Sequence, residues 1–293
     1  MKLAFLILAH KNPAQLMKLT DYLLENESVV LIHIDKKNVR DFQEFNTKYG
    51  GNKNVKIYSE YKVYWGSFNQ IRATFYLLNQ ALNNFSFDYV SLISGQDLPL
   101  RTLKEFKYFL KLNEGKDFVN VFKVEANNSW SDHGGLDRMR LFWITDYSQN
   151  LKFLFSKVNL IIHKIQHAFK WYRKIAIELY GGANWFTLSF KTAKFVDEYI
   201  IKNNEFIKLF KNTRCADEII MATILMNSVC KEKVEDNYLR YVDWQTGPES
   251  PRILRAIDFD RLSSLKNVFF ARKFDEKIDK VIVEKIYSEI LKS

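Results

Sequence analysis

Residues 3–35 read LAFLILAHKNPAQLMKLTDYLLENESVVLIHID, and this stretch decides the fold. It opens with a continuous apolar run over residues 3–8, which is typical of a strand buried on both faces of a sheet. Apolar side chains then recur at helical spacing over residues 15–24, and a β-branched run over residues 29–34 ends at Asp35. A strand, a helix and a second strand in this order predict a parallel α/β unit.

The same alternation continues along the chain. Apolar and β-branched runs predict further strands at residues 55–58 and 89–93, and helical spacing predicts helices at residues 68–82 and 104–112. With only ten glycines and four prolines, the chain of 293 residues contains no linker-like stretch. We therefore expect a single domain over residues 1–293, of the α/β class, with a mainly parallel central sheet flanked by helices.

Polar clusters follow three of the expected strands, at residues 10–12, 35–37 and 95–97. In open parallel sheets, ligands bind beyond the carboxyl ends of the strands. These three clusters are therefore expected to lie at a binding edge.

The composition favours an anionic partner. Forty-four Lys and Arg against 34 Asp and Glu give a formal charge of +10, which suits nucleic acid, an acidic membrane surface or a nucleotide diphosphate. Nucleic acid is disfavoured, because the lysines are spread along the chain and no nucleic-acid-binding motif is found. A dehydrogenase or a P-loop enzyme is disfavoured too, because neither glycine-rich phosphate motif occurs.

The two cysteines, Cys215 and Cys230, have no spacing typical of a disulfide framework or of a metal site, which fits a reducing compartment. The apolar start of the chain is followed by His10 and Lys11 rather than by small residues typical of a signal-peptide cleavage site. No apolar run approaches the length of a membrane span. A cytoplasmic protein is expected.

Residues 151–177 contain no acidic side chain and predict a basic amphipathic helical segment. One interpretation is peripheral attachment to an anionic membrane on the cytoplasmic side. The other is a helix packed on the core with a solvated lysine face.

Eight blocks carry a resemblance to a known family, and they span nearly the whole chain. They are LILAHKNP, VVLIHIDKK, VYWGSFNQIRAT, YVSLISGQDLPLRT, GGANWFTLS, ADEIIMATIL, YVDW and FFARKFD. In this order they resemble the core-2/I-branching β-1,6-N-acetylglucosaminyltransferases and the peptide O-xylosyltransferases, with the last two blocks most similar to the xylosyltransferase branch.

The resemblance implies a GT-A fold and an inverting transfer of sugar from a UDP-sugar, without a metal ion or other cofactor. The one Asp-x-Asp match, residues 258–260, lies far from the central strand where metal-using GT-A enzymes hold their cation, so no metal ligands are expected. The first expectation for the donor is N-acetylglucosamine, and xylose is the alternative. The acceptor would be an oligosaccharide, a glycolipid or a polypeptide, in the synthesis of surface polysaccharide or glycolipid.

Inverting transfer needs a base and a sink for the charge of the leaving diphosphate. The resemblance implies that Glu218 is the catalytic base, although a carboxylate at a helix start is also a common cap. It implies that Arg272 and Lys273 bind the diphosphate. The alternative is a surface basic pair without a binding role, but residues of types that are usually buried flank this pair.

Donor recognition would involve Asp35, at the end of the second strand, and Trp65 with Gly66, which would allow close approach of the nucleotide. A turn residue for Asp35 and a core aromatic for Trp65 are the alternatives. Asp97 is expected to make sugar or structural contacts.

Residues 181–186, GGANWF, resemble a Gly-Gly-Ser-Asp-Trp-Phe segment of the family. Asn184 replaces the aspartate and cannot accept a proton as a base, so the base role falls on Glu218, and the replacement leaves open an inactive relative that only binds glycans. Asn184 and Trp185 are expected at the sugar or acceptor. Asp243 and Trp244 would shape the same cleft or form a buried structural pair.

Overall fold

The computed structural model describes residues 1–126, 130–244 and 251–292. Its centre is a seven-stranded sheet in the order β10-β6-β9-β4-β1-β2-β3. Strands β1 (Leu3–Ala9), β2 (Val29–Ile34), β3 (Val55–Tyr58) and β4 (Tyr89–Ser94) pair in parallel. The expected α/β class with a mainly parallel sheet is confirmed.

The half of the sheet beyond β4 contains one antiparallel strand, which the sequence analysis did not predict. Strands β6 (Asp117–Val119) and β10 (Val234–Asp236) pair in parallel with each other. Strand β9 (Phe186–Ser189) lies between β4 and β6 and is antiparallel to both. Because β9 runs backwards, its first residues lie at the edge where the parallel strands end.

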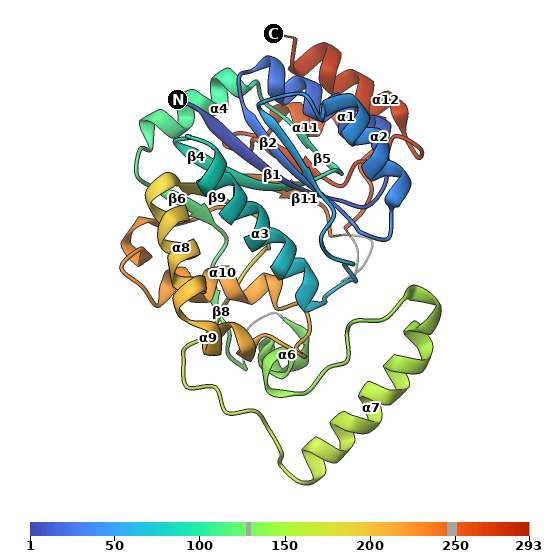
Figure 1. Ribbon diagram of the computed structural model, residues 1–293, viewed down its shortest axis with the longest axis vertical. Helices are drawn as coiled ribbons and strands as arrows, with labels where there is room; N and C mark the ends of the chain where they lie inside the picture. Colours follow the sequence, from blue (N-terminus) through green and yellow to red (C-terminus); the bar gives the residue numbers. More distant parts are fainter. Residues whose placement is uncertain (127–129, 245–250, 293) are drawn as a thin grey trace.

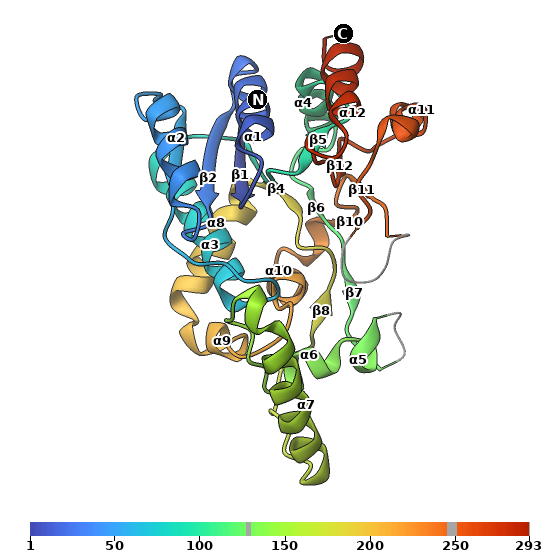
Figure 2. The ribbon, with the colours of Figure 1, turned by 90° about the vertical axis from the view of Figure 1, so that its right-hand side faces the viewer.

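Helices cover both faces of the sheet (Figures 1 and 2). Alternate residues of β1 enter two different cores, as the pleat of a doubly covered strand requires. One core includes residues of α3 (Phe68–Asn84), α8 (Phe190–Lys202) and α10 (Asp217–Met226). The other includes residues of α1 (Pro13–Glu25), α2 (Val39–Tyr49) and α4 (Leu103–Leu112).

A second sheet has the order β11-β12-β5 and carries a third core. Strand β12 (Phe270–Arg272) is parallel to β11 (Arg240–Val242) and antiparallel to β5 (Asp97–Pro99). Helices α11 (Phe259–Ser264) and α12 (Lys280–Lys285) pack on it. Two short strands, β7 (Phe122–Lys123) and β8 (Tyr180–Gly181), form a separate antiparallel pair.

Helix α7 (Lys152–Ala168) projects from the body of the molecule (Figures 1 and 2). The expected helical segment at residues 151–177 is therefore too long. Its helix ends where the side chain of Gln166 binds the carbonyl oxygen of Trp171 and Lys170 adopts φ 51°, a left-handed conformation that stops the helix. Among the residues that the structure describes, no helix is long and apolar enough to cross a membrane.

The smaller helices lie near the base of this projection and near the C-terminal region. They are α5 (Ser131–Gly134), α6 (Leu136–Arg140) and α9 (Asn204–Leu209), together with four short turns of other helix types, Gln149–Leu151, Lys231–Lys233, Ala256–Asp258 and Ile286–Ile290.

Candidate active site

Glu218 lies in the first turn of α10, a helix whose apolar residues are almost all buried. A helix that is apolar all round must lie in the interior, so its first turn is held rigidly. The backbone is fixed as well, because the carbonyl oxygen of Glu218 accepts a hydrogen bond from the Gly182 N–H at 2.9 Å. The Glu218 side chain keeps 31% of its surface exposed while its Oε2 binds Arg138 Nη1 at 2.6 Å.

Burial raises the pKa of Glu218, and the charges of Arg138, Arg214 and Arg272 oppose this shift. Its neighbour Asp217 is more deeply buried, and burial followed by the charge of Glu218 raises the pKa of Asp217 to about 7. Asp217 accepts a hydrogen bond from Gln70 Nε2 at 2.7 Å. The outer carboxylate, Glu218, is therefore the one placed to exchange a proton with a ligand.

Arg272 reaches the same region from β12. In the strand register it lies opposite Asp97, and its Nε is 3.6 Å from Asp97 Oδ1. The guanidinium group stacks 4.2 Å from the ring centre of Trp185, a cation–π arrangement that fixes its plane. Asp97 is fully buried and also accepts hydrogen bonds from the N–H and hydroxyl of Ser94. In this structure Asp97 therefore orients Arg272.

Lys273 follows directly in the sequence. The segment that carries it is bonded to the loop after β1 through Asp275. Asp275 binds Lys11 Nζ at 2.6 Å and Asn12 Nδ2 at 2.8 Å. Although burial raises it, these two bonds hold the pKa of Asp275 below its usual range. The pKa of Lys273 is lowered, first by burial and then by the charges of Lys11 and Arg272. Neighbouring cations without enough carboxylates are typical of an anion-binding site.

Gly66 has a φ of 69°, and its α-carbon lies so close to Cys215 that a β-carbon there would be 3.1 Å from the sulfur. Its carbonyl oxygen accepts the Cys215 N–H at 3.1 Å. A side chain at this position would push the loop away from α10. Trp65 is exposed, with the guanidinium of Arg214 5.5 Å from its ring centre. Trp65 and Gly66 therefore lie beside the Glu218 turn, and Trp65 is not a core residue.

Asp35 is buried at the end of β2 and is already well bonded. It accepts the Lys37 N–H at 3.0 Å and forms an ion pair with Lys37 Nζ at 3.0 Å. The pKa of His10 is lowered, mainly by burial and then by the charges of Lys11, Lys273 and Lys37. The charge of Asp35 opposes this shift. Asp35 and Lys273 thus lie around the same histidine.

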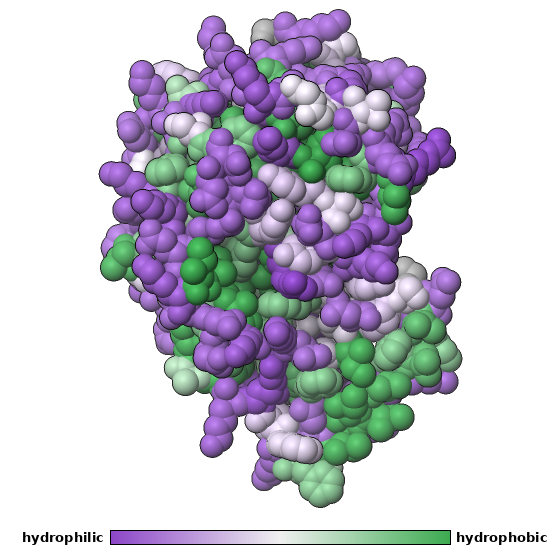
Figure 3. Space-filling model, viewed as in Figure 1, coloured by the Kyte–Doolittle hydropathy of each residue, from purple (hydrophilic) through white to green (hydrophobic). Residues whose placement is uncertain are grey.

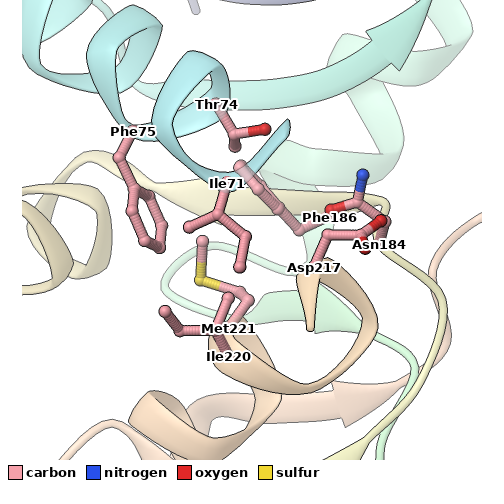
Figure 4. A pocket seen from close by; sticks show the side chains of 8 residues that line it. All are labelled: Ile71, Thr74, Phe75, Asn184, Phe186, Asp217, Ile220 and Met221. Atoms are coloured by element: carbon pink, nitrogen blue, oxygen red, sulfur yellow. The ribbon is translucent and has the colours of Figure 1, made fainter. Parts of the chain in front are cut away.

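Asn184 lies just before β9, at the edge where the parallel strands end. Its side chain and that of Asp217 line a cavity of about 10 Å³, whose other walls are Thr74 and apolar side chains (Figure 4). Within the described residues, Asn184 Nδ2 and Asp217 Oδ1 are buried without a hydrogen-bond partner. A cavity of this size is on the scale of a single water molecule.

Asp243 is buried in a charge network. Its Oδ2 lies 2.8 Å from Arg252 Nη2 and 3.3 Å from Arg261 Nη2, and both arginines also bind Asp258. Of the two interpretations of Asp243, a cleft residue or a buried structural residue, these ion pairs favour the second. Asp258, from the Asp-x-Asp match, belongs to this network as well. Trp244 is exposed, at the margin of the described residues.

The sequence did not reveal three arginines that the fold brings to the site. Arg138 binds Glu218, Arg214 stacks between Trp65 and Trp143, and Arg240 is buried with its guanidinium 5.8 Å from the Trp185 ring centre. Burial lowers the pKa of Arg240 to about 10, so it remains a cation at neutral pH. Two of them lie beside a block of the resemblance: Arg214 stands two residues before the ADEIIMATIL block, and Arg240 directly precedes the YVDW block.

Glu218 thus lies under the influence of three arginines, Arg138, Arg214 and Arg272, and a site of this kind suits a ligand that carries negative charge. A family model described as the Core-2/I-Branching enzyme matches residues 3–266. The chain therefore belongs to the Core-2/I-branching enzyme family. The family resemblance expected from the eight sequence blocks is confirmed.

Curated relatives agree with this family. Human xylosyltransferase 2 is 24% identical over 308 residues, covering 97% of this chain and 33% of the human protein. Xylosyltransferase oxt of Drosophila melanogaster is 25% identical over 313 residues, covering 96% and 32%. The chain thus spans about a third of the length of these relatives. The crystal structure of S. aureus TarS 1–349 shares a TM-score of only 0.32 at 15% identity, over 50% of this chain and 42% of that one, and carries no argument about the site.

Proposed function

We propose that this protein is an inverting glycosyltransferase of the GT-A type, which moves a sugar from a UDP-sugar to an acceptor hydroxyl without a metal ion. The observation that carries the proposal is the surroundings of Glu218: a partly exposed carboxylate with a raised pKa, bonded to Arg138 and acted on by Arg214 and Arg272. A proton acceptor beside cations that suit a departing diphosphate supports this reaction.

In the proposed reaction, the acceptor oxygen attacks the anomeric carbon and its proton passes to Glu218. Because Arg138 binds Oε2, we assign Oε1 to the proton. The bond from the anomeric carbon to the β-phosphate oxygen breaks on the opposite face, and its electron pair leaves with UDP. Attack from the opposite face converts an α-linked donor into a β-linked product. Glu218 then returns the proton to water.

Positive charge from the chain replaces a metal ion in this proposal. Arg272 and Lys273 would bind the diphosphate, and a fork-shaped guanidinium beside a point-like ammonium suits phosphate oxygens. Arg272 is already oriented by Asp97 and Trp185, so little reorganisation is needed as charge develops. Trp65, Gly66 and Asp35 would contact the nucleotide, and Asn184, Trp185 and Trp244 the sugar or the acceptor.

The donor expected first is N-acetylglucosamine. Xylose is the second candidate, and it is favoured by the relatives that are named xylosyltransferases. Asn184 lies where the resemblance places an aspartate, so the donor preference can differ from theirs. The acceptor would be an oligosaccharide, glycolipid or polypeptide in the synthesis of surface polysaccharide or glycolipid, used by an enzyme located in the cytoplasm or peripherally at the inner face of the cell membrane.

Calorimetric titration tests the proposal. The protein is titrated with UDP and with the UDP-linked forms of N-acetylglucosamine, xylose, galactose and glucose, first in EDTA and then with Mn²⁺. Binding in EDTA with a preference for one sugar would support the metal-free site and identify the donor. Binding only with Mn²⁺ would contradict the metal-free reaction, and no binding in either condition would contradict the donor class.

A further inference from the structure

Helix α7 presents its polar side to its own chain and its apolar side outwards, the reverse of an ordinary surface helix. Its two buried residues are Asn159 and Gln166. The Asn159 amide binds both the N–H and the carbonyl oxygen of Ile144, at 2.9 and 3.0 Å. Gln166 accepts from the Phe142 N–H at 3.0 Å. Backbone hydrogen bonds, rather than apolar packing, attach this helix to the segment that precedes it.

The outward side carries large apolar side chains. Phe153 and, just after the helix, Phe169 and Trp171 are 73%, 78% and 73% exposed. Figure 3 shows the resulting patch over α7. We call it the α7 patch; its members are Leu151, Phe153, Leu154, Leu160, Ile161, Ile165, Phe169 and Trp171. A contiguous apolar patch of this kind on a polar surface marks a binding surface.

An apolar groove of about 460 Å³ borders the α7 patch, between Ile162 and Ile165 on the helix and Trp171 and Tyr172 on the returning chain. Phe142, Gln166 and Arg173 also line it. The apolar surface therefore continues from α7 onto the chain that follows it at Trp171 and Tyr172. The helix and this segment would enter an apolar medium together.

The charge of this segment selects the partner. Residues 151–177 carry five lysines, one arginine and no acidic residue. Lys157 and Lys164 follow Phe153 and Leu160 by four residues, so they share the outward side of the helix, and Lys157 Nζ lies 4.2 Å from the Phe153 ring centre. Lysines with apolar stems between aromatic anchors are typical of helices that lie in the headgroup layer of a bilayer. Two copies joined through this face would oppose like charges.

From these observations we infer that the α7 patch docks on a lipid bilayer with anionic headgroups, with Phe153, Phe169 and Trp171 as apolar anchors and Lys157 and Lys164 at the phosphates. Both ends of the projection lead into the site. Arg138, three residues before Leu141, binds Glu218, and the returning chain reaches Asn184 through β8. Where the proposed transfer holds, docking brings the site to acceptors anchored in the membrane; the docking itself does not depend on the transfer.

The test is co-sedimentation of the whole protein with vesicles of neutral phosphatidylcholine or of phosphatidylcholine with phosphatidylglycerol. We expect binding to the anionic vesicles that weakens with salt. The triple variant Phe153→Ser, Phe169→Ser, Trp171→Ser should lose at least tenfold in partitioning, and Lys157→Gln with Lys164→Gln should lose binding to anionic vesicles. The matched control Leu112→Ser, Ile201→Ser, Val229→Ser, changed at exposed apolar residues elsewhere, should stay within twofold of the unchanged protein.

Three results would overturn the inference: no sedimentation with anionic vesicles, equal sedimentation of the triple variant, or a concentration-dependent dimer in light scattering that the triple variant abolishes, which would assign the patch to a second copy. UDP titration of the same variants separates this inference from the proposed function. The triple variant should bind UDP as the unchanged protein does. If the unchanged protein binds vesicles but no UDP-sugar, the transferase proposal fails and the docking stands.

Discussion

Glu218 and Asp217 are adjacent carboxylates with different surroundings, and this difference assigns their roles. Glu218 is partly exposed and bonded to an arginine, whereas Asp217 is buried and bonded to a neutral amide. Environments that separate two titratable groups in this way are typical of acid–base sites. The family resemblance pointed to Glu218, and its partial exposure and its bond to Arg138 support the proposal that it, rather than Asp217, is the base.

Replacement of Glu218 by Gln should lower kcat by about 10²–10⁴-fold, the usual contribution of a general base. The dissociation constant for UDP should change by less than about threefold, because the amide keeps the size of the side chain and the phosphate cations are untouched. Steady-state kinetics with the donor found by titration, together with UDP calorimetry, measures both quantities. Turnover near that of the unchanged protein would remove Glu218 from the base role.

Arg138→Gln tests the electrostatics of the same site. The charge of Arg138 opposes the rise of the Glu218 pKa, so its removal should raise that pKa further. The base must be ionised to act, and the acid limb of the pH profile of kcat/KM should therefore move to higher pH. A loss of activity that is uniform across the profile would show that Arg138 acts only as a structural partner. Lys202→Gln, in an exposed pair far along α8, serves as the control.

At the scale of elements, β2 carries a buried histidine. Burial lowers the pKa of His33 to about 4, with Asp35 opposing the shift, and its Nε2 accepts the Tyr61 N–H at 3.1 Å. The unfolded chain binds this proton near pH 6.5. Between those two pH values only the unfolded state is protonated, so the stability contributed by neutral His33 is complete above pH 6.5 and is lost as the pH falls towards 4.

Chemical denaturation at pH 7 and pH 4 should therefore show a loss of unfolding free energy, of which about 3 kcal/mol belongs to His33. His33→Gln, which can still accept the Tyr61 hydrogen bond, should show a smaller loss over the same range. An identical loss in both proteins would contradict the assignment. The variant keeps Asp35 and Lys37, so a change in their ion pair does not explain the difference.

The elements predicted best from the sequence are those with strong periodicity. The strands at residues 29–34 and 55–58 have the bounds found in the structure, and the expected helix at 68–82 ends two residues early. The three-residue strands β5, β6, β10, β11 and β12 were missed. Strands this short contain too few residues for an alternating pattern, and their pairing depends on chain segments far away in sequence.

For the candidate site, the sequence blocks identified Glu218, Arg272 and Lys273. They did not identify Arg138, Arg214 and Arg240. Arg272 could be placed because buried-type residues flank it in the sequence. Arg138 lies in a segment without any motif and Arg240 just outside the YVDW block, and α6 and β11 position them in the fold. Asp243 resembles a cleft residue in its YVDW block, yet in the fold it faces Arg252 and Arg261.

At the scale of the whole molecule, the first strand region and the last motif are tied together. Besides the Asp275 bonds to Lys11 and Asn12, Gln15 and Glu276 exchange two hydrogen bonds of 2.9 Å. These contacts hold the segment that contains Arg272 and Lys273 against the end of β1. The diphosphate site proposed here therefore depends on contacts between the first and the last of the eight sequence blocks.

Asp275→Ala should destabilise the protein by about 1–3 kcal/mol, because Asn12 is buried and loses its partner. UDP binding should weaken as well, because the segment that carries Lys273 loses the bonds that anchor it to Lys11 and Asn12. Urea denaturation and UDP calorimetry measure the two effects. Glu198→Gln, which breaks an exposed pair with Lys202, should alter stability by less than about 0.5 kcal/mol. Equal stability of the two variants would contradict the tie between the chain ends.

The projection that carries α7 begins and ends at nearly the same place. The Arg173 N–H donates to the Arg140 carbonyl oxygen at 3.0 Å, so the chain between them leaves the body and returns to a single point. Such a module can be lengthened, shortened or exchanged during evolution without moving a strand of the sheet. Relatives with the same catalytic body could therefore be sent to different surfaces in the cell by a change confined to this one excursion.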